Sequence, residues 1–251
     1  MKLFTSIIYL FLSLAKPIQA AEEIIIADSG DQPPFVIGND GGMSAGLAKI
    51  FNEVQDRYKF KYMHLPSKRM RHLIKTGKID IAAFDNLKWS WDKSVVYGSK
   101  DLVHSKDMFF VLKKNLNKKP FSKIGKSAIA VTNGFHYNFS NYKIDLDTYR
   151  RLSMNPVKSE TTVFDFVLAE RTLLGITSSS VLNYFRKYRP KDFEKIALRP
   201  KPDQTYKRQL ILSKKSPLSI VDLNRLIDKV SETGDLRKLF AKFGMEDDLA
   251  I

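Results

Sequence analysis

The sequence predicts an α/β protein with two lobes that are joined by two strands. Short apolar segments alternate with amphipathic ones up to residue 84, and a second series of the same kind begins at Ala128. An apolar segment also flanks this second series on each side. In sheets built from such alternation, ligands bind outside the carboxyl ends of the strands.

The first series has the order strand, helix, strand, helix, strand. Three consecutive isoleucines at 24–26 indicate a buried strand, and Gly30 with the Pro33-Pro34 pair indicates the loop that follows it. In chain order we expect a strand over 23–27, a loop over 28–34, a helix that opens at 41–44, a strand over 58–65, a helix over 67–75 that Gly77 ends, and a strand over 79–84.

The second series predicts a separate lobe. Its expected elements are a helix that starts at 132–134, a helix over 161–171, a strand over 173–177 and a helix over 179–188, and helices over 218–232 and 235–243 end the chain. We interpret the apolar segments 108–113 and 207–212 as two crossings between lobes. The first lobe is then discontinuous, comprising 21–110 and 208–251, and the second lobe is 111–207.

Residues 1–20 have the pattern of a cleavable secretory signal peptide. Lys2 gives the positive start, 3–15 are almost entirely apolar, and a small residue precedes the expected cleavage after Ala20. The apolar run is shorter than the roughly 20 residues that cross a membrane. Because the sequence has no cysteine, no lipid-modified cysteine or disulfide is possible. We therefore expect a soluble periplasmic protein without stable membrane insertion.

The net charge of +15 is concentrated in the middle of the chain. Residues 112–206 hold 18 Lys and Arg against 8 Asp and Glu, a net of +10. The basic residues occur in scattered pairs without a recognition motif, so we expect no nucleic acid as a partner. The excess predicts attraction of an anionic ligand or a membrane surface, and solvated surface charge is the alternative for most of these residues.

Several short motifs follow one another in the order of a known family. They are Pro33-Pro34-Phe35, Ser44-Ala45-Gly46-Leu47, Pro66-Ser67-Lys68-Arg69, Gly77-Lys78-Ile79-Asp80, Tyr97-Gly98-Ser99 and Glu232-Thr233-Gly234-Asp235-Leu236. With this series the chain resembles a divergent subgroup of the type II periplasmic solute-binding proteins, in the amino-acid-binding family 3 class of ABC transporters. The resemblance implies the two-lobed periplasmic binding protein-like II fold, with two hinge strands and a small-molecule ligand between the lobes.

Two departures from that family concern the ligand. Its amino-acid binders hold the α-carboxylate with an arginine about fifteen residues after the glycine of Gly77-Lys78-Ile79-Asp80, and that position is Asp92 here. They hold the ammonium group with an aspartate at a position that falls, by spacing from Arg171, on Ser178. The resemblance therefore argues against an ordinary zwitterionic amino acid as the ligand.

The candidate contacts of the first lobe surround the end of its third expected strand. Trp89 and Trp91, the two tryptophans of the chain, could stack on a planar ligand or a cation, or could cover the sheet. Asp85 could bind an amine or hydroxyl group, or cap the next turn. Arg69 lies in the first turn of a helix, where the dipole disfavours a cation, so either a ligand carboxylate or a salt bridge is expected there. Phe35 is the predicted contact from the first loop.

The candidate contacts of the second lobe lie in two turns that follow strands. Gly134, His136 and Tyr137 bring backbone N–H groups and two polar rings to an expected helix start, which would make an anion site. His136 could equally be a surface or capping residue. Ser178 offers a hydroxyl group at the next turn, or only an N-cap.

Other chemistry finds no support in the sequence. Gly125-Lys126-Ser127 lacks the earlier glycine of a phosphate-binding loop, because Pro120 occupies that position. The four histidines have no metal-ligand spacing, and no nucleophile elbow occurs. We therefore expect no metal, no cofactor and no catalytic residue.

These observations predict a monomeric solute-binding protein. It would close on a small, anionic or carboxylated ligand and deliver it to the permease of an ABC transporter. Two alternatives stay open. Cyclohexadienyl-type dehydratases share the scaffold, and Asp85, Asp92 or His136 would then be the acid in the cleft. A free sensory partner of a membrane receptor would look the same in sequence.

Overall fold

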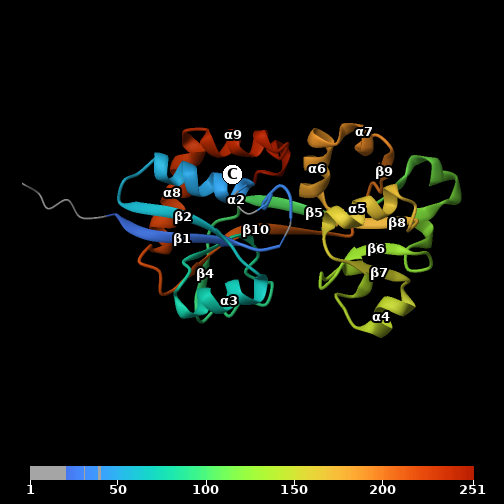
Figure 1. The fold of residues 1–251 in the computed structure, drawn as a ribbon, viewed down its shortest axis with the longest axis horizontal. Coiled ribbons are helices and arrows are strands. Elements are labelled where there is room, and N and C mark those ends of the chain that lie inside the picture. Colours follow the sequence, from blue (N-terminus) through green and yellow to red (C-terminus); the bar gives the residue numbers. More distant parts are fainter. Residues whose placement is uncertain (1–20, 31, 39–40) are drawn as a thin grey trace, which may run out of the picture.

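Two α/β lobes lie side by side along the long axis of the molecule (Figure 1). The computed structural model describes residues 21–30, 32–38 and 41–251, so the expected signal peptide at 1–20 lies outside the described residues. Strands β5 (Val103–Leu112) and β10 (Gln204–Ser213) extend from one lobe into the other. Within the described part of the chain, no helix has the length and apolar character needed to cross a membrane.

The first lobe has a mixed sheet in the order β2-β1-β3-β10. β1 is parallel to β2 and β3, whereas β10 is antiparallel to β3 and to the short strand β4. Its elements are β1 (Glu22–Asp28), α2 (Met43–Glu53), β2 (Tyr58–His64), α3 (Ser67–Thr76), β3 (Ile81–Asp85), β4 (Val96–Gly98), α8 (Ile220–Glu232), α9 (Asp235–Lys242) and the 3₁₀ turn η4 (Glu246–Asp248).

Alternation along the strands buries both faces of this sheet. Ile24 and Ile26 of β1 point into the core beneath α2, α8 and α9, while Ala27 points into the smaller core beneath α3. Figure 1 shows the corresponding arrangement, with α2, α8 and α9 on one side of the sheet and α3 on the other. The carboxyl ends of β1 and β3 therefore lie together at the edge that faces the second lobe.

The second lobe repeats this plan with a sheet in the order β5-β8-β6-β7. β6 is parallel to β7 and β8, and β5 is antiparallel to β8 and β9. Its further elements are η1 (Lys113–Lys118), η2 (Pro120–Lys123), β6 (Ile129–Thr132), η3 (Asn138–Ser140), α4 (Leu146–Arg151), β7 (Met154–Val157), α5 (Glu160–Leu168), β8 (Leu174–Ser178), α6 (Ser179–Tyr188), α7 (Pro190–Phe193) and β9 (Ile196–Leu198).

The two long strands form the hinge. Residues 103–107 of β5 pair antiparallel with 204–208 of β10. Beyond this pair, β5 continues against β8 and β9 of the second lobe, and β10 continues against β3 and β4 of the first. The segments expected to cross, 108–113 and 207–212, overlap these strands, and the lobe boundaries drawn from the sequence stay a prediction.

The prediction of a helix beginning at 132–134 is wrong. The chain instead forms a loop and the 3₁₀ turn η3, and the next α-helix is α4. The Asp203 carboxylate accepts hydrogen bonds from the backbone N–H groups of Asn138 and Phe139, at 2.8 and 3.0 Å. Tyr137 turns into the core, where its hydroxyl group accepts a hydrogen bond from the Thr132 N–H. Long-range partners thus satisfy groups that would otherwise start a helix.

Candidate functional site

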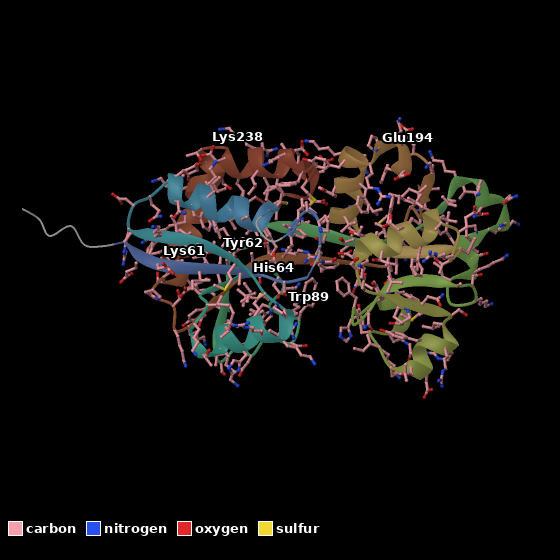
Figure 2. All side chains as sticks on the ribbon, in the orientation of Figure 1. Lys61, Tyr62, His64, Trp89, Glu194 and Lys238 are labelled. Carbon is pink, nitrogen blue, oxygen red and sulfur yellow. The ribbon has the colours of Figure 1, made fainter. Side chains whose placement is uncertain are left out.

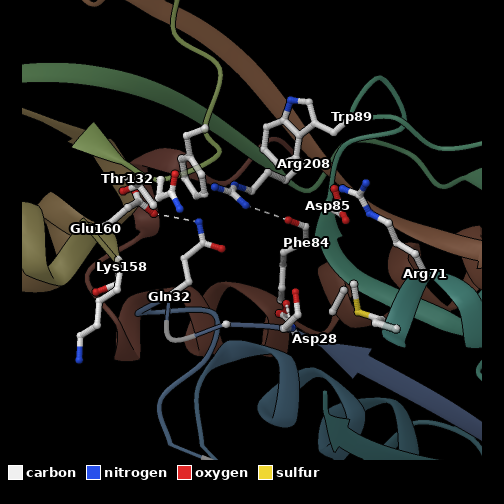
Figure 3. A pocket seen from close by; sticks show the side chains of 17 residues that line it. Asp28, Gln32, Arg71, Phe84, Asp85, Trp89, Thr132, Lys158, Glu160 and Arg208 are labelled. Atoms are coloured by element: carbon white, nitrogen blue, oxygen red, sulfur yellow. Dashed lines mark hydrogen bonds between the residues drawn. The ribbon is translucent and has the colours of Figure 1, made fainter. Parts of the chain in front are cut away.

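A cleft of about 300 Å³ lies between the lobes, at the carboxyl ends of β1, β3 and β6 (Figure 3). This is the edge at which parallel sheets place their ligands. The first lobe contributes the larger share of the lining, with Asp28, Ser29, Gly30, Gln32, Met70, Arg71, Ala83, Phe84, Asp85, Trp89 and Arg208. The second lobe contributes Thr132, Asn133, Phe135, Lys158, Ser159 and Glu160.

Arg208 places a buried positive charge in this cleft. Arg208 is only 3% exposed to solvent. Its guanidinium carbon lies 4.7 Å from the ring centre of Phe35 and 5.1 Å from that of Trp89. Its hydrogen bonds go to neutral acceptors: the Phe84 carbonyl oxygen at 3.1 Å, the Ser105 hydroxyl at 3.4 Å and the Tyr206 hydroxyl at 3.5 Å. Among the described residues, no carboxylate oxygen forms a salt bridge with it, so a planar, bidentate donor is available for an anion.

The backbone beside Arg208 departs from regular strand geometry at Phe84 and in the pairing of β10 with β3. Phe84 has a φ of 49°, in the left-handed region that bulky residues rarely adopt, and its carbonyl oxygen accepts from Arg208. The pairing of β10 with β3 shifts register between Gln209 and Ile211, opposite this point. Such irregularities redirect side chains beside binding sites. Here they coincide with the point at which Asp85 enters the cleft.

Two carboxylates of the first lobe face the same cleft from the ends of β1 and β3. Asp28 accepts hydrogen bonds from the Ser44 hydroxyl and from the Ser29 N–H, but burial raises its pKa to about 7. Asp85 accepts from the Asn86 N–H at 2.6 Å, and burial raises its pKa also. Figure 3 shows Arg71 of α3 extending toward Asp85. A ligand cation would stabilise the ionised form of both carboxyl groups.

Glu160 contributes a third carboxylate, from the second lobe. It is 2% exposed at the first position of α5, where it accepts from the Ser178 N–H at 2.6 Å and the Thr177 hydroxyl at 2.9 Å. The side-chain amide of Gln32 in the first lobe donates to Glu160 at 2.8 Å (Figure 3). This hydrogen bond joins the two lobes directly across the cleft.

The hinge strands carry a further buried carboxyl group. Asp107 of β5 accepts from the Gln204 amide at 2.7 Å and from the Tyr206 hydroxyl at 3.1 Å. Burial raises the pKa of Asp107 to about 7. Because Tyr206 also accepts from Arg208, the hinge and the cleft share one network of polar contacts.

The structure places four of the five predicted first-lobe residues in or beside the cleft. Asp85 and Trp89 line it, and Trp89 lies at the side of the first lobe that faces the second (Figure 2). Phe35 is buried beneath the Arg208 guanidinium. Trp91 lies behind the lining, 5.6 Å from the Arg71 guanidinium carbon. Arg69, the fifth, is exposed on α3 and outside the lining.

None of the four predicted second-lobe residues lines the cleft. Gly134 lies between the lining residues Asn133 and Phe135, and the exposed His136 ring bonds to the Tyr142 carbonyl oxygen at 2.6 Å. Tyr137 is buried in the lobe core, and the Ser178 hydroxyl accepts from the Val181 N–H as the N-cap of α6. The ligand contacts of all nine predicted residues stay a prediction.

Sequence reasoning missed Asp28, Gln32, Arg71, Glu160 and Arg208. Asp28 could have been predicted in the same way as Asp85, because both carboxylates come directly after a buried strand. Arg208 follows Lys207 directly before the apolar run 210–212, and a pair of basic residues at that place is a weaker signal. For Gln32 and Glu160 the sequence offers no signal, because they are 128 residues apart and meet only in the folded chain.

Comparison with solved structures defines the class of fold. The GluR0 ligand-binding core from Nostoc punctiforme, in complex with (L)-glutamate, aligns with 88% of this chain and 99% of its own at 16% identity and a TM-score of 0.67. The probable amino-acid ABC transporter extracellular-binding protein ytmK from Bacillus subtilis aligns with 90% and 99% at 15% identity and a TM-score of 0.71. An ancestral amino acid-binding protein, a precursor of cyclohexadienyl dehydratase, aligns with 88% and 95% at 18% identity and a TM-score of 0.67.

These likenesses establish the architecture that the sequence predicted. The chain has the two-lobed α/β fold of the periplasmic solute-binding proteins, with two hinge strands. No protein-family model and no curated protein matches the sequence. The charged side chains that line the cleft are therefore the main indication of the chemical class of the ligand.

Proposed function

We propose that the chain is a periplasmic solute-binding protein. After export and loss of its signal peptide, it closes its lobes as a monomer on one small ligand and delivers that ligand to the permease of an ABC transporter. The observation that carries this proposal is Arg208, a buried cation in the cleft with neutral hydrogen-bond acceptors. A side chain in that state is suited to a ligand carboxylate.

The ligand carries an ammonium group as well as a carboxylate. Asp28 and Asp85 line the cleft on the first-lobe side, and burial raises the pKa of both, so a cation beside them would be stabilising. The basic second lobe predicts a carboxylated ligand, and Arg208 supports that part of the prediction. We propose that Arg208 replaces the arginine missing at position 92, and that Asp28 and Asp85 replace the aspartate missing at position 178, in contrast to the expectation from the sequence that the ligand is no ordinary zwitterion.

The test is a thermal-shift screen followed by calorimetry. Its three ligand sets are zwitterionic amino acids, carboxylates without an amine, and amines without a carboxylate. We expect zwitterions to give the largest shifts, and Arg208→Gln to weaken the best of them about 10- to 100-fold through loss of a charge-assisted hydrogen-bond pair. The matched control is Arg225→Gln, which removes an exposed arginine on α8 of the same lobe.

Two outcomes would contradict the proposal. Unchanged affinity in a folded Arg208→Gln protein would place the ligand elsewhere. The second outcome is that carboxylates without an amine bind best and that Asp28→Asn and Asp85→Asn both leave the affinity unchanged. The cleft would then have no ammonium site, and its ligand would be purely anionic. Circular dichroism of each variant separates lost binding from lost folding.

A second candidate function is turnover of a cyclohexadienyl acid. The observation that favours it is Asp28, because a buried carboxyl group with a pKa of about 7 in a ligand cleft can donate a proton near neutral pH. Asp85 lines the same cleft, whereas Asp92 and His136, the other acids considered from the sequence, are exposed and outside its lining. Incubation with prephenate and arogenate tests this function, and loss of turnover in Asp28→Asn would support it.

A further inference from the structure

The end of the second lobe carries a strongly basic surface, which we call the lysine face. It consists of Lys113, Lys114, Lys118, Lys119, Lys123 and Lys126, all exposed. No aspartate or glutamate occurs between positions 113 and 126. In the part of the chain that the structure describes, one ion pair involves these lysines, between Lys114 and Glu170 at 2.5 Å. Within the described ranges, the other five ammonium groups have no carboxylate at salt-bridge distance.

The backbone that presents the lysine face is held in place by the lobe. Lys113 donates its backbone N–H to the Lys195 carbonyl oxygen at 2.8 Å, and Asn115 and Pro120 are buried between the lysines. Phe121 and Ile124 pack against one of the two second-lobe cores. The lysines therefore project from an ordered surface, and binding would cost little backbone ordering.

Neighbouring residues enlarge this surface. Leu152 lies so close to Gly125 that a Cβ there would meet its Cδ2 atom at 3.1 Å, and the exposed Arg151 precedes Leu152 in the chain. Leu116 is 45% exposed among the lysines, so the surface also has an apolar residue. Figure 1 shows segment 113–126 at the end of the second lobe that points away from the first lobe. The lysine face is thus remote from the cleft.

We propose that the lysine face docks on an anionic lipid surface. Lysine ammonium groups are flexible, compact charges that need no fixed partner geometry, which suits a fluid layer of headgroups, and Leu116 could enter the interface between them. Phe121, the aromatic residue between Lys113 and Lys126, packs against the lobe core, so it does not offer a free ring for stacking on nucleic acid bases. Because this surface is separate from the cleft, a docked protein would still open and close, and the proposal is independent of the ligand.

The experiment is co-sedimentation of the chain from Ala21 onward with lipid vesicles. We expect binding to vesicles that contain phosphatidylglycerol, none to pure phosphatidylcholine, and a steep loss of binding as salt rises from about 50 to 300 mM. The variant Lys118→Gln, Lys123→Gln, Lys126→Gln should bind roughly 100-fold more weakly at low salt, at about fivefold per lysine near the surface. The matched control is Lys59→Gln, Lys75→Gln, Lys93→Gln, which removes three exposed lysines from the first lobe.

The control should bind nearly as well as the natural chain. Equal losses in the two triple variants would mean that net charge alone acts, and would overturn the proposal. Binding to phosphatidylcholine vesicles that does not change with salt concentration would also overturn the proposal. Binding to poly-aspartate without binding to phosphatidylglycerol vesicles would overturn it in favour of an acidic protein partner.

Discussion

Buried ionisable side chains dominate this molecule at the scale of single residues. Arg208, Asp28, Asp85, Asp107 and Glu160 surround the cleft and the hinge, and burial is the largest cause that raises the pKa of the three aspartates. Each costs folding free energy when it is charged and unpaired. Their placement in the cleft, where a ligand could supply the missing charges, is typical of a binding site.

The first prediction concerns the pH dependence of stability. Between pH 4 and 7 Asp28 is ionised in the unfolded chain but still protonated in the folded protein, because its pKa rises from 3.8 to about 7 on folding. The folded state then binds more protons, so the contribution of Asp28 to stability is present below pH 4 and is lost as the pH rises to about 7. Asp28→Asn should thus be more stable than the natural chain at pH 8, by about 2–4 kcal/mol.

Urea unfolding at pH 5 and pH 8 measures this difference. The control is Asp56→Asn, which neutralises an exposed aspartate of the same lobe and should change stability by less than about 0.5 kcal/mol. A lower stability of Asp28→Asn at both pH values would show that the hydrogen bonds from Ser44 and Ser29 outweigh the cost of burying the charge.

At the scale of elements, the loop between β3 and β4 connects the sheet edge to the cleft. It begins at Asn86, whose side-chain amide donates to the Lys207 carbonyl oxygen of β10 at 2.7 Å. Trp89 follows, with its ring 5.2 Å from that of Tyr206, and lines the cleft. Trp91 instead packs with the core beneath α3. Two tryptophans that are two residues apart therefore have different surroundings.

This difference predicts separate fluorescence responses. Ligand binding should shift the emission of Trp89, because its ring loses water when the cleft fills, and should leave Trp91 nearly unchanged. In a titration with the best ligand of the screen, Trp91→Phe should keep the spectral shift and Trp89→Phe should abolish it. The opposite pattern would mean that the ligand binds on the α3 side of the loop.

The whole molecule has contacts between its lobes on two sides of the hinge. Gln32 and Glu160 meet across the cleft. Away from the cleft, the Tyr188 hydroxyl of α6 donates to the Lys242 carbonyl oxygen at 2.6 Å, and the Asn183 amide donates to Asp248 at 2.7 Å. Lobe closure is therefore governed by opposing sets of contacts as well as by the ligand.

The balance between these contacts can be measured by small-angle X-ray scattering. Gln32→Ala removes the contact across the cleft, so we expect a larger radius of gyration in the free protein than in the natural chain. Tyr188→Phe removes one hydrogen bond between the lobes outside the cleft and should not produce this opening. Equal radii in the natural chain and in Gln32→Ala would show that the Gln32–Glu160 bond does not hold the lobes together.

The order of elements was predictable because it is encoded in local patterns. The helix expected at 179–188 is confirmed as α6, and the strand expected at 173–177 is confirmed as β8 with its bounds moved by one residue. Apolar spacing along each segment decides these assignments without information from elsewhere in the chain. The helix predicted to begin at 132–134 does not form, because the Asp203 carboxylate, from a distant segment, accepts hydrogen bonds from the backbone N–H groups that follow.

The sequence by itself determined the α/β class, the two long strands between the lobes, and the position of the loop after β3 beside the cleft. These features follow from hydrophobic periodicity and from the rule that ligands bind at the carboxyl ends of parallel strands. Only the tertiary structure decided which charges meet in the cleft. Asp28, Glu160 and Arg208 come from three distant segments, and the burial that raises the pKa of Asp28 arises only when the chain folds.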